Sequence, residues 1–304
     1  MKYAYYPGCS LDATGIEFGE SNKLVAKKLG LDLWEIPDWN CCGASAGHLT
    51  NHMLALSLPA RNLAIAEKAG IEAVAVPCAA CFARCKATAE AVKSSEEMQK
   101  KISDIIEMDY QAKAEILSLL DVVGKRIGLE KIKAQVTKPL NGLKVACYYG
   151  CLLVRPPKIA QSDDPENPMV MDHIMEAIGA EPVDWGYKTE CCGASHVVTK
   201  PDVGKEMIYE ILKNAEVNGA EAIATACPLC MLNLDMRQKQ INAKKGTNFN
   251  IPIYYFTELM ALSFGCSGKE VGLSKHFWPA EGLIQKAFGH QRSGDTPQPG
   301  NVPN

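Results

Sequence analysis

The chain has 304 residues, of which 47% are hydrophobic and 22% are charged, and its formal net charge is −3 at pH 7. This length suggests about two domains of ordinary globular composition, and the small net charge excludes a general electrostatic affinity for nucleic acid or anionic membranes. No apolar stretch approaches the ~18 residues that span a bilayer, and the first residues are too polar for a signal peptide, so we expect a cytoplasmic protein.

The first part of the chain alternates strand and helix patterns. Residues 2–6 form a short buried strand that Pro7 and Gly8 end. Thr14 and Glu17 resemble a capping box at the start of a helix that Gly30 stops. A second strand, a second helix ended by a glycine, and a third strand follow at residues 31–36, about 52–69 and 73–76.

The rest of the chain repeats this alternation after a charged stretch. Residues 86 to about 136 have a helical pattern, clearest at 112–123, and predict a helical appendage that closes the first domain. Residues 139–142 read as a linker. Further strands are expected near residues 143–148, 181–185, 221–225 and 251–256.

These patterns predict an α/β fold of two pseudo-symmetric β-α-β-α-β domains with parallel sheets. The first domain is expected over residues 1–139 and the second over 140–288. From residue 289 onward the chain is polar and rich in glycine, proline and glutamine, which predicts a flexible tail over 289–304.

An internal repeat links the two halves. Cys-Cys-Gly-Ala-Ser occurs at residues 41–45 and again at 191–195, and Gly-Cys occurs at 8–9 and 150–151. The first half reads C-x31-C-C-x35-C-x-x-C, and the second reads C-x39-C-C-x34-C-x-x-C. Five cysteines at matched positions in both halves indicate a duplicated site.

The cysteines indicate metal or redox chemistry. The chain has 13 of them, a share of about 4%, below the >8–10% of small disulfide scaffolds. Disulfides are also rare in the cytosol, where thiolates more often bind metal. The cysteines follow the predicted strands, and loops beyond the carboxyl ends of parallel strands meet at one sheet edge, so we expect the thiols to converge there.

The spacing of the cysteines limits the cofactor. Adjacent cysteines are poor disulfide partners, because neighbouring Cα atoms lie about 3.8 Å apart and a relaxed disulfide needs about 4.4–6.8 Å. Structural zinc and a cubane [4Fe–4S] cluster each take four protein ligands. Five thiols per repeat therefore favour an unusual iron–sulfur cluster, with glycines beside the cysteines allowing backbone N–H groups to approach sulfur.

The repeated cysteine pattern resembles that of the CCG cysteine-rich domain family over about residues 1–260. Within that family it is most similar to the B-subunit group of heterodisulfide reductases of the soluble methanogen type. The segments that carry this closer similarity are Asp-Pro-Glu-Asn-Pro at 164–168, Cys-Pro-Leu-Cys at 227–230 and Tyr-Phe-Thr-Glu-Leu at 255–259. The second half departs slightly from the family pattern, with 34 residues in its last long gap.

The resemblance implies two non-cubane [4Fe–4S] clusters, each held by five cysteines. The implied metal ligands are Cys9, Cys41, Cys42, Cys78, Cys81, Cys151, Cys191, Cys192, Cys227 and Cys230. It also implies reduction of the coenzyme M–coenzyme B heterodisulfide to two thiols, an oxidoreductase activity that belongs to methanogenesis. The implied partners are a ferredoxin-like C subunit and a flavin-bearing A subunit, with a hydrogenase or formate dehydrogenase upstream and neither nucleic acid nor a membrane span.

Two alternatives stay open. The chain could be an iron–sulfur subunit of another CCG-family oxidoreductase, linked to lactate, glycolate or fumarate. It could also be a zinc-stabilised module or a passive electron carrier without catalytic activity.

Other polar and sulfur side chains are weaker candidates. Cys85, Cys147 and Cys266 lack partners in the repeat and are expected to be non-ligands. His196 follows the second Cys-Cys-Gly and is a candidate for lining the substrate cleft or donating a proton, though it could equally be an ordinary side chain. His48 and His52 have a metal-compatible i, i+4 spacing but read better as caps or surface groups. Trp39 and Trp185 are candidates for shielding the clusters or simply for core packing, and several basic residues near the cysteines are candidates for binding substrate anions, namely Arg84, Lys86, Arg155, Lys188 and Lys200.

Overall fold

Two parallel sheets of four strands form the framework of the molecule. The computed structural model describes residues 2–44 and 46–289. Of the tail predicted over 289–304, Gly289 ends a helix and the other residues lie outside the described residues. The first sheet has the order β2-β1-β3-β4 and the second the order β6-β5-β7-β8. Every paired strand runs parallel to its neighbour, which confirms the predicted α/β class with two parallel sheets.

The strands of the first sheet are β1 (Lys2–Tyr5), β2 (Asp32–Glu35), β3 (Ala73–Val76) and β4 (Glu115–Ser118). Those of the second are β5 (Lys144–Tyr148), β6 (Glu181–Pro182), β7 (Ala222–Thr225) and β8 (Ile253–Tyr255). The central strands β3 and β7 are buried at every residue, as expected where helices cover both faces of a parallel sheet.

Helices surround the sheets on both faces. In the first half they are α1 (Ile16–Leu29), α2 (Gly47–Thr50), α3 (His52–Lys68), α4 (Ala79–Ser94), α5 (Glu96–Ile106), α6 (Leu119–Asp121) and α7 (Leu129–Lys133), with the 3₁₀ turn η1 (Cys9–Asp12) and the π-helix η2 (Val122–Ile127). In the second half they are α8 (Pro157–Ala160), α9 (Val170–Ala177), α10 (Pro201–Val217), α11 (Pro228–Met236), α12 (Gln238–Lys245), α13 (Phe256–Ser263) and α14 (Glu281–Gly289), with the 3₁₀ turn η3 (Leu273–Lys275). Among the residues described, no helix is long and apolar enough to cross a membrane.

Most predicted elements are present, with three corrections. The helical appendage is wrong in part, because β4 lies within the stretch assigned to it and pairs with β3 from Ala73↔Glu115 to Val76↔Ser118. The capping box is wrong, because Gly15 precedes α1 and makes no side-chain cap bond. Strand β6 has only two residues, far fewer than the range near 181–185 suggested. The division of the chain near residue 139 stays a prediction.

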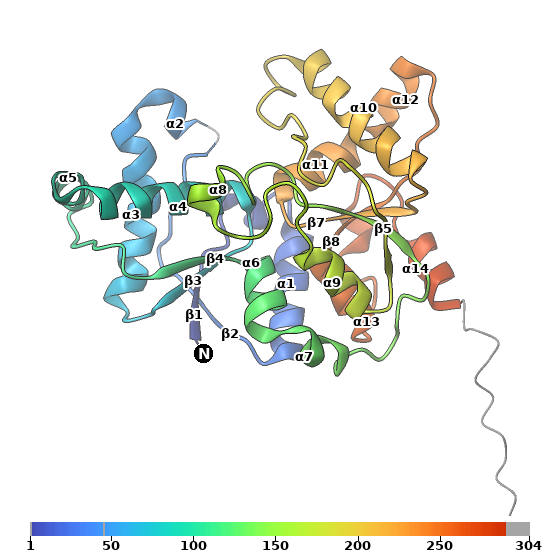
Figure 1. Cartoon of the computed structure of the whole chain (residues 1–304), viewed down its shortest axis with the longest axis horizontal. Helices are drawn as coiled ribbons and strands as arrows, with labels where there is room; N and C mark the ends of the chain where they lie inside the picture. The colour runs from blue at the N-terminus through green and yellow to red at the C-terminus, as the bar shows by residue number, and fades with distance from the viewer. Residues whose placement is uncertain (1, 45, 290–304) are drawn as a thin grey trace, which may run out of the picture.

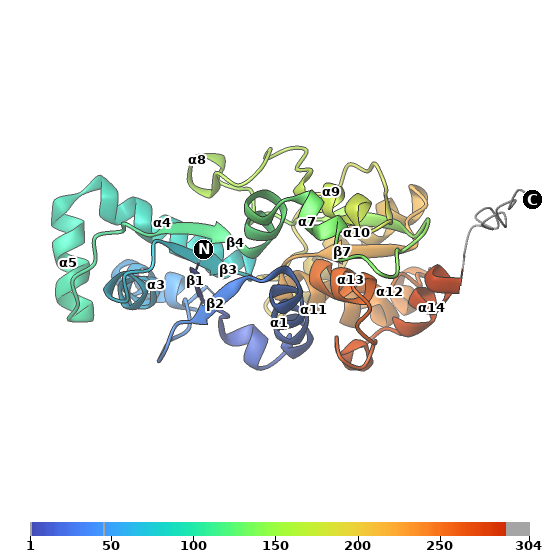
Figure 2. The same ribbon diagram turned by 90° about the horizontal axis from the view of Figure 1, so that it is seen from below.

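The two halves join through helices that occupy equivalent places. Helix α1 packs against α13, and α9 packs against η2. Figure 1 shows the first sheet to the left and the second to the right, with α1 between them and α9 and α13 next to it, below β7 and β8. The same helices lie at the junction in the view of Figure 2. The junction therefore repeats the pseudo-symmetry of the sequence.

Candidate metal centre

The ten cysteines with repeat partners follow the carboxyl ends of the strands. In the first half, Cys9 begins η1 after β1, the pair Cys41–Cys42 follows β2, and Cys78 and Cys81 lie at the start of α4 after β3. The second half repeats this arrangement after β5, β6 and β7. Strands β1 and β3 are neighbours whose connections run to opposite sides, and in open α/β sheets this is the position at which ligands bind.

The thiols of the first half come together in pairs. The Sγ atoms of Cys9 and Cys41 lie 3.7 Å apart, and those of Cys42 and Cys81 lie 3.1 Å apart. Cys42, Cys78 and Cys81 are buried, while Cys9 and Cys41 are exposed. This sulfur site is therefore open to solvent on the side of Cys9 and Cys41.

The second half forms the matching site. The Sγ atoms of Cys192 and Cys230 lie 3.5 Å apart, and the thiol of Cys151 is the largest influence on the pKa of Cys191. Asn233 on α11 donates its amide N–H to the carbonyl of Cys192 at 3.1 Å and approaches the sulfur at 3.7 Å.

The two sulfur sites adjoin each other at Cys78 and Cys227. The neighbouring thiol of Cys227 raises the pKa of Cys78, and the thiols of Cys230 and then Cys78 lower the pKa of Cys227. Both side chains are buried. The first cysteine of each C-x-x-C therefore lies at the junction of the two repeats, which joins ten thiols in one continuous region.

The electrostatics favour thiolates at specific positions. A hydrogen bond with Cys81 is the largest influence on Cys42 and lowers its pKa to about 7. A hydrogen bond with Cys151 similarly lowers the pKa of Cys191 to about 6, with a further contribution from His196. Burial, followed by the neighbouring Cys41, raises the pKa of Cys9 to about 11. Thiolates are the form that binds metal.

The glycines beside the cysteines make room for sulfur. A Cβ atom at Gly8 would lie 2.9 Å from Cys81 Sγ, and one at Gly150 would lie 3.1 Å from Cys230 Sγ. Gly43 and Gly193 both have φ of 72°, and their N–H groups point at the sulfurs of Cys41 and Cys191 at 3.4 and 3.3 Å. The predicted close approach of backbone to sulfur is thus present in both repeats.

Aromatic side chains cover both sites in equivalent ways, a feature that the sequence interpretation found only in part. Tyr6 donates to the carbonyl of Asn40 at 2.8 Å, and Tyr148 donates to the carbonyl of Glu190 at 2.6 Å, in each case the residue before the Cys-Cys pair. Trp39 packs edge-on against Tyr6, and Trp185 packs against Tyr148. The tyrosine before each Gly-Cys was the available signal.

The arrangement of the thiols fits a cluster better than a single metal ion. Closely paired thiols, backbone donors to sulfur and glycine-made space are features of iron–sulfur sites. Among the residues that the structure describes, no group of three or more His, Cys, Asp or Glu side chains is arranged as a site for a metal ion.

The three cysteines without repeat partners take no part in the paired thiols of the two sites. Cys85 is fully buried on α4, and Cys147 is fully buried within β5. Cys266 lies half-buried after α13. Burial raises the pKa of Cys85 and of Cys147 well above the ordinary thiol value, as expected for small buried side chains rather than reactive thiols.

The three histidine candidates lie in different surroundings. Asn51 has extended backbone angles between α2 and α3, so positions 48 and 52 belong to two different helices. The exposed His52 begins α3. His196 is half-buried, and its backbone N–H bonds the carbonyl of Gly193 at 2.8 Å. The charge of His196 acts on Cys191 of the site and helps to lower its pKa.

Most basic candidates have other partners. Lys188 is buried and pairs with the buried Asp172 at 2.9 Å. Arg155 pairs with Glu166 at 3.2 Å, and Lys86 lies over the ring of Phe82. Lys200 is exposed.

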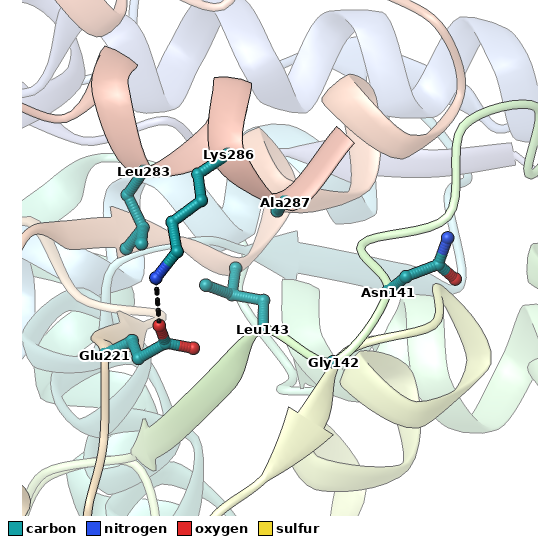
Figure 3. A pocket seen from close by; sticks show the side chains of 7 residues that line it. All are labelled: Asn141, Gly142, Leu143, Glu221, Leu283, Lys286 and Ala287. Atoms are coloured by element: carbon teal, nitrogen blue, oxygen red, sulfur yellow. Dashed lines mark hydrogen bonds and ion pairs between the residues drawn. The ribbon is translucent and has the colours of Figure 1, made fainter. Parts of the chain in front are cut away.

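A small surface pocket lies at the opposite end of the second sheet (Figure 3). It has a volume of about 90 Å³, and its walls include Leu143, Glu221 and Lys286. Leu143 and Glu221 directly precede β5 and β7, so this pocket is at the amino ends of the strands. An ion pair of 3.2 Å between Lys286 and Glu221 crosses it. It is unrelated to the cysteine edge.

The fold and the site define a duplicated α/β protein with two joined thiol-lined centres. The family model described as "Cysteine-rich domain" (CCG) matches residues 3–86 and 145–235. The chain belongs to the CCG cysteine-rich domain family, and the resemblance inferred from its cysteine pattern is confirmed.

Relatives among characterised proteins cover nearly the whole chain. The chain is 32% identical to the membrane anchor subunit of the 8-methylmenaquinol:fumarate reductase of Wolinella succinogenes, over 90% of this chain and 95% of that protein. It is 30% identical to the B subunit of the ferredoxin/F420H2-dependent CoB-CoM heterodisulfide reductase of Methanosarcina acetivorans, over 90% of this chain and 93% of that protein. An Archaeoglobus profundus protein, described as similar to the B subunit of heterodisulfide reductase, is 27% identical over 89% of this chain and 93% of its own length.

A solved structure shares the fold. The crystal structure of a hypothetical protein from Helicobacter pylori matches with a TM-score of 0.71 at 14% identity. The match covers 91% of this chain and 52% of that one, so the chain spans about half of its length.

Proposed function

We propose that this chain is the catalytic subunit of an oxidoreductase that reduces the coenzyme M–coenzyme B heterodisulfide to two thiols. The observation that carries the proposal is the meeting of two five-cysteine sites at Cys78 and Cys227. The similarity of the chain to the B subunit of a CoB-CoM heterodisulfide reductase supports the same substrate. A cytoplasmic location stays a prediction.

The ten repeat-paired cysteines would hold two non-cubane [4Fe–4S] clusters, five to each. When bound, such clusters supply single electrons and a site for a substrate sulfur. Reduction of one disulfide consumes two electrons and two protons and releases two thiols, so two adjoining sites match the electron count. This correspondence favours the duplicated architecture over a single centre.

The chain's own residues would prepare this chemistry. The N–H groups of Gly43 and Gly193 stabilise negative charge on the sulfurs of Cys41 and Cys191. Tyr6 and Tyr148, with their tryptophan neighbours, exclude water from the inner side of each site. The exposed Cys9 and Cys41 mark the side from which a substrate can enter. His196 is the candidate proton donor on the second repeat.

Electrons would reach the sites from other subunits. The chain has no G-x-G-x-x-G flavin or dinucleotide fingerprint and no four-cysteine ferredoxin run. We therefore propose a ferredoxin-like C subunit and a flavin-bearing A subunit as partners, with a hydrogenase or formate dehydrogenase upstream.

Metal analysis and spectroscopy of anaerobically purified protein test the proposal. We expect about eight irons and eight sulfides per chain, four for each cluster. The electron paramagnetic resonance (EPR) signal of the oxidised protein should change when coenzyme M thiol is added. Zinc with little sulfide would refute an iron–sulfur enzyme.

A matched pair of variants tests the ligand set. Cys81→Ser should lose about half of the iron, because Cys81 belongs to the first site. Cys85→Ser, four residues further along the same buried helix, should keep the full content. Equal iron losses in both variants would contradict the assignment.

An iron–sulfur subunit in a fumarate-linked oxidoreductase is the second candidate. The 32% identity to the fumarate reductase protein of Wolinella succinogenes favours it. A content of about eight irons per chain, together with an EPR signal that does not change when coenzyme M thiol is added, would be consistent with the two clusters and would support this second candidate.

A further inference from the structure

Tyr255 is a buried side chain at the junction of the two repeats. It is the last residue of β8 and directly precedes α13. Its ring stacks on Phe18 of α1, with centroids 4.1 Å apart and planes within 3°. The residue is fully buried. Two elements from different halves of the chain, α1 and the β8–α13 segment, therefore fix the position of the ring.

The hydroxyl of Tyr255 has no hydrogen-bond partner among the residues that the structure describes. A Cβ atom at Gly15 would lie 3.0 Å from this hydroxyl and 3.2 Å from the Cβ of Pro228. Pro228 directly follows Cys227, and η1, which begins at Cys9, contacts α11. The hydroxyl thus lies where the cysteine segments of the two repeats meet.

The electrostatic surroundings point to the same location. Burial raises the pKa of Tyr255, and the carboxylates of Glu17 and Glu258 and the thiolates of Cys227 and Cys78 raise it further. Cys227 and Cys78 are the two thiols that join the sulfur sites. The buried hydroxyl of Tyr255 is a hydrogen-bond donor without an acceptor among the described residues.

The equivalent residue of the first repeat has a hydroxyl that is hydrogen-bonded within the polypeptide. Ser118 ends β4 opposite Val76, just as Tyr255 ends β8 opposite Thr225. The hydroxyl of Ser118 is satisfied within its own turn by Asp121. Burying an unpartnered hydroxyl costs about 1–3 kcal/mol, so the larger Tyr255 requires an acceptor that the described polypeptide does not supply.

We propose that Tyr255 donates a hydrogen bond to sulfur at the junction of the two sites, and so raises the reduction potential of the centre bound there. This inference rests on the iron–sulfur centre of the proposed function. Reduction adds negative charge to the centre, and a donor aimed at sulfur stabilises that charge. Tyr255 therefore acts on the reduction potential through a sulfur atom and is not itself a ligand of the centre.

The test compares Tyr255→Phe with Tyr254→Phe in the full, cluster-loaded protein. Tyr254 is an equally buried neighbour whose hydroxyl donates to the carbonyl of Ala280. In an EPR-monitored redox titration, Tyr255→Phe should make reduction about tenfold less favourable, which is about 59 mV for one electron. Tyr254→Phe should leave the potential unchanged and instead lower the unfolding temperature, because its hydroxyl has an intramolecular acceptor.

A second readout detects the proton directly. Electron–nuclear double resonance in H₂O and D₂O should show an exchangeable proton coupled to the centre, and Tyr255→Phe should remove it. If Tyr255→Phe fails to load iron, Gly15→Ala, which crowds the same hydroxyl, should lower the potential in the same direction.

The outcomes separate the two proposals. An unchanged potential and an unchanged proton coupling in iron-loaded Tyr255→Phe would overturn the role of Tyr255 alone. Wild-type protein without iron and sulfide would overturn the proposed function as well.

Discussion

Gly8 and Gly150 occupy the same place in the two repeats and face the same sulfur of the C-x-x-C. Gly8 has φ of 75° and ψ of 161°, a backbone conformation that residues with side chains rarely adopt. The adjacent Sγ of Cys81 leaves no space for a methyl group. A glycine is therefore required at this position for two reasons, namely the backbone conformation and the space that the sulfur occupies.

Gly8→Ala and Gly128→Ala separate these two requirements. Gly128 has nearly the same backbone angles, φ of 87° and ψ of 155°, but a Cβ there would have no neighbour within 4 Å. Both variants should lose about 1–3 kcal/mol in the free energy of unfolding from backbone strain. Only Gly8→Ala should also lose iron and sulfide from the first site. Iron analysis together with urea unfolding checks this, and equal metal contents would contradict a role for space at sulfur.

The cysteine sets could be predicted at the residue scale because each follows a short motif that occurs twice. The contact between Cys78 and Cys227 could not, since it depends on how one repeat packs on the other. The unpartnered hydroxyl of Tyr255 could not be predicted from the sequence for the same reason. Its tyrosine follows an ordinary strand pattern, and only its packing against Phe18 places it near sulfur.

At the scale of elements, the second repeat holds its cysteine loop with a buried ion pair. Lys188 and Asp172 of α9 are only 5% and 3% exposed, and Tyr149 donates to Asp172 at 2.7 Å. The carbonyl of Lys188 also accepts from the N–H groups of Tyr149 and Gly150. The equivalent position before the first Cys-Cys pair is Asp38, which is exposed and pairs with Arg61.

Lys188→Met should therefore destabilise the protein by about 3–5 kcal/mol, because it leaves the Asp172 carboxylate buried without a counterion. Lys101→Met, which breaks the exposed pair with Glu97, should cost less than about 1 kcal/mol. Urea unfolding measures both. The double variant Lys188→Met/Asp172→Asn should recover most of the loss, and a double variant as unstable as the single one would refute this explanation.

Strand β4 shows why some elements escape sequence interpretation. Glu115–Ser118 has only four residues, within a stretch whose apolar spacing is also compatible with a helix. Its extended conformation depends on pairing with β3, a partner about forty residues earlier in the chain. In contrast, β3 and β7 are almost wholly apolar and bounded by glycine and by proline or alanine before cysteine, so their own residues predict them.

At the scale of the whole molecule, the duplication brings two sulfur sites together, and the packing of helices at the junction fixes their relative position. Phe18 and Tyr255 stack across it, and the hydroxyls of Ser21 and Thr257 lie 2.8 Å apart and buried. These contacts join α1 of the first repeat to the β8–α13 segment of the second. The distance between the two sulfur sites thus depends on the packing of helices and not on a covalent link.

Phe18→Ala and Phe82→Ala distinguish the junction from the core of a single repeat. The two phenylalanines are equally buried, at 0% and 1% exposure, and truncation of either should cost about 3–5 kcal/mol. Phe82 lies on α4 of the first repeat, so its loss should lower the unfolding temperature while both repeats still unfold together. Loss of Phe18 should instead let the repeats unfold in two calorimetric steps and weaken the magnetic interaction between the two centres.

A single transition that is only shifted in temperature in Phe18→Ala would show that other contacts hold the two repeats together. The α9–η2 contact occupies the equivalent place in the junction, so its side chains would then be the next to truncate.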